Sequence, residues 1–220
     1  MWERLSPQAR QVMDLARDAA EELDHSYIGD EHVLIGMLRQ GDSGAARLLA
    51  EAGMDLARTV SELRRLQDRG LTPRRQVDDA AALRSIGIDV ETVRRQLIAT
   101  HGAEAVGEAV WQGSRRPWWR GGGRRQTPLC GPGLFAKRSL ARAAEAADAR
   151  GSDLVSCEDL LDGVLSNLDK ARSRLSRGDR RHLRQLGWTL VPDPPARRLL
   201  ASHGIDPAEL RARLRSDRPV

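Results

Sequence analysis

The chain contains the same helix-ending junction three times, which predicts a fold built from repeated helical pairs. In each copy a glycine, an apolar residue and an aspartate follow a helical pattern, at residues 53–55, 87–89 and 204–206. Glycine can take the left-handed conformation that ends a helix, the apolar residue folds back onto that helix, and the aspartate caps the next one. The third junction continues into Pro207 and Glu209, which complete a typical helix start.

The helical pattern itself is also repeated. A shift of 127 residues places residues 136–165 on residues 9–38 without a gap and with eight identical positions. A shift of 151 residues places residues 196–206 on residues 45–55, so the second copy has an insertion of about 24 residues. The sequence therefore predicts two copies of one helical unit.

We expect the chain to have four parts. These are a first repeat at residues 1–66, a half-repeat helix pair at 67–111, an Arg/Gly/Trp-rich linker at 112–132, and a second, divergent repeat at 133–215 with the insertion at about 169–192. Alanine and leucine dominate the composition, and the five tryptophans, one tyrosine and one phenylalanine are the only aromatic residues. This composition favours helices over strands, so we predict an all-α fold.

Composition and motifs argue against several classes of function. The net charge is +5, but arginine supplies nearly all the basic side chains, so this excess is weak support for an anionic partner. The two cysteines and five histidines lack the spacing of a metal site, and no P-loop or nucleophile-elbow motif occurs. No segment suits a signal peptide or a membrane span. We expect a cytoplasmic protein that is not an enzyme, with no catalytic residue, no metal, no cofactor and no membrane partner.

Residues 23–38 carry the most specific motif, LDHSYIGDEHVLIGML. It resembles the first repeat of the Clp N-terminal (Clp repeat) domain family, as in ClpA- and ClpC-type AAA+ unfoldases, in the pattern His-x-Tyr-Ile-Gly-x-Glu-His followed by an apolar helix. The segment AARLLAEAGMDL resembles the next helix pair of that family, and the opening MWERLS places Trp2 at its usual aromatic position. The resemblance covers residues 1–66 closely and residues 133–215 more weakly.

This resemblance implies two four-helix repeats related by a pseudo-twofold axis, to which the chain adds the half-repeat helix pair and the basic linker. In the family the domain precedes ATPase rings and receives adaptors or substrates, so this chain resembles a stand-alone copy that lacks the ATPase modules. The implied partners are Clp unfoldase or protease components, adaptors, tagged substrate proteins and cyclic peptide antibiotics. Such a module would feed a Clp protease or act as a decoy for it.

The resemblance also implies site residues. Glu31 and Glu158 match glutamates that grip the guanidinium of phosphoarginine in some family members, whereas a purely structural interpretation has them complement a helix dipole. Trp2 matches an aromatic residue on a hydrophobic surface for partners and antibiotics, with packing against the core as the alternative. For His25 and His32 we expect a structural role in the turn.

The linker supports a hypothesis of another class, because arginines that neutralise phosphates and tryptophans that stack on bases bind single-stranded nucleic acid. A basic linker whose tryptophans cover the repeat junction is the interpretation we favour. Cys157 precedes a predicted helix, a position that favours a lowered thiol pKa. The residues of the nucleic-acid hypothesis are Arg115, Arg116, Trp118, Trp119, Arg120, Arg124 and Arg125.

Overall fold

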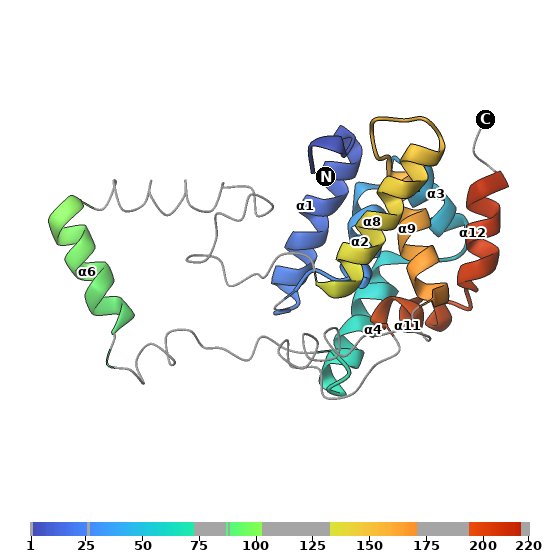
Figure 1. The fold of residues 1–220 in the computed structure, drawn as a ribbon. Coiled ribbons are helices and arrows are strands. Elements are labelled where there is room, and N and C mark those ends of the chain that lie inside the picture. Colours follow the sequence, from blue (N-terminus) through green and yellow to red (C-terminus); the bar gives the residue numbers. More distant parts are fainter. Residues whose placement is uncertain are drawn as a thin grey trace. The chain divides into compact units, whose positions relative to one another are not determined.

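The computed structural model describes residues 2–25, 27–72, 87, 89–102, 133–170 and 194–216 (Figure 1). The chain divides into two compact units, one formed by Met1–Arg74 with Leu129–Val220 and the other by Arg75–Pro128. Regular structure in these described stretches is helical, apart from one isolated parallel bridge between Leu5 and Val155. The predicted all-α fold is confirmed.

The first repeat is preceded by a short 3-10 helix and contains four α-helices whose starts are capped as their sequences predict. Ser6 Oγ accepts a hydrogen bond from the Ala9 amide at 3.1 Å, and Asp55 Oδ1 accepts one from the Arg58 amide at 2.7 Å. Side-chain caps of this kind satisfy amides that have no partner within the helix. The elements are η1 (Trp2–Arg4), α1 (Pro7–Glu22), α2 (Asp30–Gln40), α3 (Gly44–Glu51) and α4 (Leu56–Asp68).

The second repeat has four helices in the same order. Its caps are partly different, because Pro194 precedes α11, whereas Asp206 Oδ1 accepts from the Ala208 amide at 2.6 Å at the start of α12. One further helix, α6 (Val90–His101), lies in the other unit. The helices of the second repeat are α8 (Leu134–Ala149), α9 (Cys157–Lys170), α11 (Pro195–Ser202) and α12 (Pro207–Ser216).

The helix-ending glycines have the predicted left-handed conformation. The φ angles of Gly53, Gly87 and Gly204 are 87°, 83° and 72°. At the first junction the Met54 amide donates to the Leu49 carbonyl at 2.9 Å, which is the long hydrogen bond of a Schellman motif. The Ile205 amide donates to the Leu200 carbonyl at the same distance, and Ile88 lies outside the described residues.

A glycine sets the close crossing of the first two helices in each repeat. A Cβ atom on Gly36 of α2 would lie 2.3 Å from the backbone oxygen of Val12 in α1. A Cβ atom on Gly163 of α9 would lie 2.2 Å from the backbone oxygen of Ser139 in α8. Gly163 and Ser139 are each 127 residues beyond their counterparts. The two repeats therefore share one packing geometry, which explains why this glycine recurs.

The two repeats are joined by reciprocal backbone hydrogen bonds, which we call the crossed clips. The Ser6 amide donates to the Val155 carbonyl at 2.9 Å, and the Gly133 amide donates to the Ile28 carbonyl at 2.8 Å. These pairs are again related by the shift of 127 residues. Each first helix is therefore preceded by a segment that binds the turn of the other repeat, as a pseudo-twofold relation requires.

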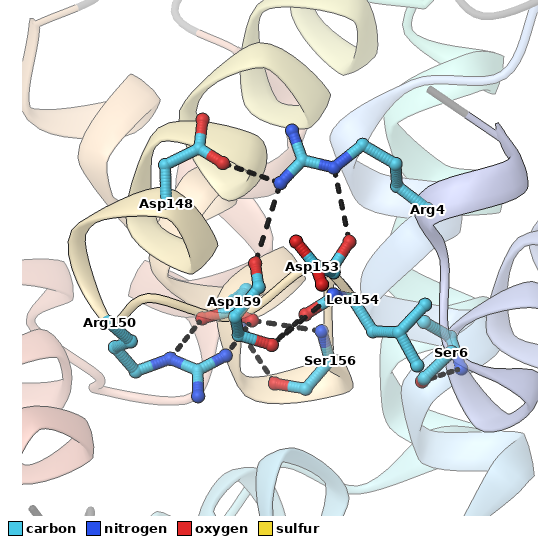
Figure 2. Close-up of polar contacts among 10 residues, drawn as sticks. Arg4, Ser6, Asp148, Arg150, Asp153, Leu154, Ser156 and Asp159 are labelled. Carbon is cyan, nitrogen blue, oxygen red and sulfur yellow. Dashed lines mark hydrogen bonds and ion pairs between the residues drawn. The ribbon is translucent and has the colours of Figure 1, made fainter.

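A cluster of charged side chains surrounds the first of these clips (Figure 2). The Arg4 guanidinium binds the Asp148 carboxylate at 2.5 Å and donates from Nε to the Asp153 carbonyl at 3.1 Å. Arg150 binds both carboxylate oxygens of Asp159, at 3.2 and 2.5 Å. Arg4 thus connects the N-terminal segment to the end of α8 and the following turn.

Candidate functional site

The two equivalent glutamates lie in the first turns of α2 and α9, and their surroundings differ. Glu31 in α2 is 1% exposed, and the Tyr27 hydroxyl donates a hydrogen bond to its Oε1 at 2.7 Å. A Cβ atom on Gly29 would lie 2.4 Å from the same oxygen, so only glycine leaves room for the carboxylate. Burial raises the pKa of Glu31 to about 7, although the Tyr27 hydroxyl opposes that rise. Glu31 is enclosed within its own repeat.

The Glu158 carboxylate is only partly buried and lies at the start of α3 in the other repeat. Its Oε1 accepts a hydrogen bond from the Ala45 amide at 3.2 Å. The amides at a helix start carry partial positive charge and attract anions. Gly44 permits this approach, because a Cβ atom there would lie 2.9 Å from Oε1. The second repeat therefore brings together a carboxylate and a helix N-terminus.

A single substitution explains why one glutamate is covered and the other is not. The residue equivalent to Tyr27 in the second repeat is Leu154, which is 48% exposed and has no hydroxyl to donate. Tyr27 is 3% exposed and packs beside His32, with ring centroids 5.6 Å apart. Tyr27 thus holds Glu31 inside, and Glu158 has no such cover from Leu154.

The two histidines of the motif form a buried hydrogen-bonded relay. His32 Nδ1 accepts from the Gly29 amide at 2.8 Å, so the ring proton lies on Nε2, which donates to His25 Nδ1 at 2.7 Å. His25 Nε2 then faces Thr72 Oγ1 at 3.3 Å. Burial lowers the pKa of His32 well below its usual value, which keeps the ring neutral. The expected structural role in the turn agrees with these contacts.

His25, Glu31 and His32 also form a group of potential metal ligands, whose donor atoms lie within 4.8 Å of one another. Two ring nitrogens 2.7 Å apart share a proton, which is closer than two nitrogens around one zinc ion lie. The ring nitrogens are thus engaged in hydrogen bonds, and the geometry is that of a relay. His32 has the same task as Asp159 in the second repeat, where Oδ2 accepts from the Ser156 amide at 2.9 Å.

The residues that precede the glutamates also differ. Asp30 is fully buried, and Asn167 donates to its Oδ2 at 2.9 Å across the repeat boundary. Burial raises the pKa of Asp30 to about 6. At the equivalent position, burial and the neighbouring Glu158 carboxylate raise the pKa of the Cys157 thiol to about 11. The expectation of a lowered pKa at Cys157 was wrong, because desolvation outweighs the helix start.

The remaining predicted residues lie elsewhere. Trp2 is half-buried in η1. The seven arginines and tryptophans of the nucleic-acid hypothesis fall in residues 103–132, outside the described residues, so that hypothesis stays a prediction. Among the described helices, none is long and apolar enough to pass through a bilayer. The sequence reasoning missed the α3 amides as the partner of Glu158, although the cap Ser43 before Gly44 marks that helix start.

Comparison with known proteins identifies the first repeat. Residues 4–78 match the family model of the Clp repeat (R) N-terminal domain. The chaperone protein ClpB of Oceanobacillus iheyensis is 39% identical over 61 residues, which are 28% of this chain and 8% of that protein. The negative regulator of genetic competence ClpC/MecB of Bacillus subtilis shows the same identity, length and coverage. The matched segment is therefore a small part of these relatives.

A solved structure supports the fold of the whole chain. The crystal structure of the N-terminal domain of the caseinolytic protease associated chaperone ClpD from Arabidopsis thaliana matches with a TM-score of 0.52 and 12% identity. The match covers 98% of this chain and 95% of that chain. At this identity the likeness concerns the fold alone. The family resemblance predicted from the sequence is confirmed.

Proposed function

Residues 4–78 carry a Clp repeat N-terminal domain, and from this premise we propose that the chain is a non-catalytic recognition module of a Clp protease system. Its ligands are substrate proteins tagged with phosphoarginine, adaptors or cyclic peptide antibiotics. By binding them it delivers ligands to a Clp unfoldase or competes with the unfoldase as a decoy. The domain boundaries and the cytoplasmic location predicted from the sequence stay predictions.

The position of Glu158 at the start of α3 carries this proposal. A phosphoarginine side chain has a cationic guanidinium next to an anionic phosphoryl group, so its receptor needs a carboxylate beside an anion-binding element. The Glu158 carboxylate supplies the first and the N-terminal amides of α3 supply the second, with Ala45 N–H already 3.2 Å from Oε1. On ligand binding the carboxylate turns to the guanidinium, and the phosphoryl group takes the amides.

The enclosed Glu31 gives the two repeats unequal parts in this proposal. Tyr27 and Gly29 surround its carboxylate, so a ligand would have to displace a buried hydroxyl to reach it. Exposing that carboxylate breaks the hydrogen bond and moves an aromatic ring out of the core, both at a cost in free energy. We assign phosphoarginine recognition to Glu158 and a supporting role to Glu31. Trp2, half-buried in η1, remains the proposed contact for hydrophobic partners and antibiotics.

Calorimetric titration with a phosphoarginine peptide tests this assignment, with the unmodified arginine peptide as the control ligand. The variant Glu158→Gln should bind the phosphoarginine peptide at least about tenfold more weakly, because the charge-assisted contact to the guanidinium is lost. The matched variant Glu31→Gln should bind as the unaltered protein does. Equal losses in both variants would overturn the unequal assignment, and absence of selective binding would overturn the phosphoarginine receptor.

A further inference from the structure

The second repeat contains a charged cavity that has no counterpart of the same character in the first repeat. It has a volume of about 340 Å³ and lies between α8, α9 and α12, away from the α3 helix start. Two of these helices contribute arginines and two contribute acidic residues. The lining residues are Arg142, Glu145, Ala146, Ala149, Asp162, Ser166, Arg211 and Arg215.

The cavity is open because two long side chains of the first repeat are replaced by short ones. The residues equivalent to Ala149 and Ser166 are Glu22 and Arg39. Those two form a bidentate ion pair, with nitrogen–oxygen distances of 3.0 and 2.5 Å. This pair bridges α1 and α2 where the second repeat has only a methyl group and a hydroxymethyl group. The space in the second repeat is therefore a consequence of specific substitutions.

The walls of the cavity also change from apolar to charged. Asp162 takes the place of the fully buried Ile35, and Arg211 takes the place of Val60. Arg211 binds Asp162 through Nε at 2.8 Å and Nη2 at 3.3 Å, and Arg215 binds the same carboxylate through Nε at 3.3 Å. The carboxylate thereby orients two guanidinium groups from one helix at the edge of the cavity. Desolvated charges are expensive, so a repeat that introduces three of them needs a compensating use.

Arg142 supplies a third guanidinium from α8, which binds Glu145 at 2.8 Å. The lining thus has three guanidinium groups against two carboxylates, and its net charge is positive. Arginine forks on two sides of a cavity suit a tetrahedral oxyanion, which presents several oxygens in different directions. A planar carboxylate is matched by a single fork.

From these observations we infer that the cavity between α8, α9 and α12 binds the phosphate group of a small molecule. Arg215 and Arg142 contact the phosphate oxygens, and Asp162 is a positioning residue that keeps Arg211 and Arg215 in place. The volume of about 340 Å³ is at the lower end of small-molecule sites. This site is separate from Glu158, and the inference does not depend on the proposed phosphoarginine recognition.

The test is calorimetric titration of the full chain with inorganic phosphate and, in a second arm, with glycerol 3-phosphate. The double variant Ala149→Glu with Ser166→Arg transfers the ion pair of the first repeat into the cavity and should weaken binding at least about tenfold. Arg215→Gln should also weaken it, whereas Arg64→Gln, at the equivalent position of the first repeat, should leave it unchanged. Stronger binding in the second arm would identify an organic phosphate as the ligand, and stronger binding in the first would identify free phosphate.

Circular dichroism checks that the double variant keeps its helices, and Arg215→Gln provides a surface change if the double variant does not fold. A salt titration adds a second readout, because a phosphate held by arginines is released as ionic strength rises. Absence of saturable binding in both arms would overturn the inference. Binding that is equally strong in Arg215→Gln and Arg64→Gln would do the same.

Discussion

The two repeats share one backbone arrangement but use the same glutamate in opposite ways. In the first repeat Glu31 is enclosed beneath Tyr27, and in the second Glu158 lies partly exposed against the start of α3. Their backbones agree down to the glycine at the helix crossing and the crossed clips. The comparison shows that duplication preserved the positions where backbones touch, while side chains at the surface of each repeat became free to differ.

The largest expected effect concerns the shared crossing. Gly36→Ala and Gly163→Ala would each place a Cβ atom within 2.3 Å of a backbone oxygen, which the packed helices can relieve only by moving apart. Each variant should lose about 3 kcal/mol of the free energy of unfolding, measured by urea denaturation. Gly44→Ala is the control, because its Cβ atom meets only the end of the flexible Glu158 side chain. A loss in one repeat but not the other would show that the crossings are not equivalent.

The enclosed glutamate makes the first repeat sensitive to pH. The pKa of Glu31 is raised from 4.5 to about 7, so the folded state holds this proton more tightly than the unfolded state does. The stability from this group is present at low pH and is lost as pH rises through about 7. The stability of Glu31→Gln relative to the unaltered protein should therefore increase by about 2 kcal/mol between about pH 5.5 and 7.5. Denaturation curves at both pH values measure this difference, and a constant difference would refute the buried acid.

The contact between the repeats should be weaker than either crossing. Asn167→Ala removes the hydrogen bond to the buried Asp30 carboxylate and should cost about 1.5 kcal/mol of unfolding free energy. The equivalent change Gln40→Ala removes only the acceptor of the Ser43 amide at the start of α3. It should cost less, and thermal denaturation of both variants provides the measurement. A larger loss in Gln40→Ala would place the more important contact in the first repeat.

The smallest effects are expected where the repeats use the same cap. Asp55 Oδ1 accepts from the Arg58 amide at 2.7 Å and Asp206 Oδ1 from the Ala208 amide at 2.6 Å. Asp55→Ala and Asp206→Ala should each cost about 1 kcal/mol. Equal shifts in thermal midpoint would support equivalent junctions, and a clear inequality would argue that one helix start has a second source of stability.

Local rules let the sequence predict the framework of the fold. The positive φ angles of Gly53 and Gly204, the caps at Ser6 and Asp55, and the helix that each begins all follow from residues adjacent in the chain. The state of the glutamates could not be predicted in this way. It depends on whether the residue four positions earlier, Tyr27 or Leu154, folds inward, and on which helix start packs nearby.

The thiol of Cys157 shows the same limit. A helix start favours the thiolate and can be recognised in a sequence, but the burial that raises its pKa to about 11 comes from residues distant in the chain. The cavity of the second repeat was also beyond reach, because its opening depends on Ala149 and Ser166 facing one another across two helices. Only an aligned comparison with Glu22 and Arg39 would have revealed the missing pair.

The crossed clips have a consequence for how such a molecule can be assembled. Ser6 reaches the turn at Val155 while Gly133 reaches the turn at Ile28, so each half donates to the other the contact that it receives. Mutual exchange of one surface is the defining property of an isologous two-fold dimer. A polypeptide with a single repeat and both parts of the clip would therefore have the means to pair with an identical copy, and two separate half-molecules would be able to recombine without the segment that connects them.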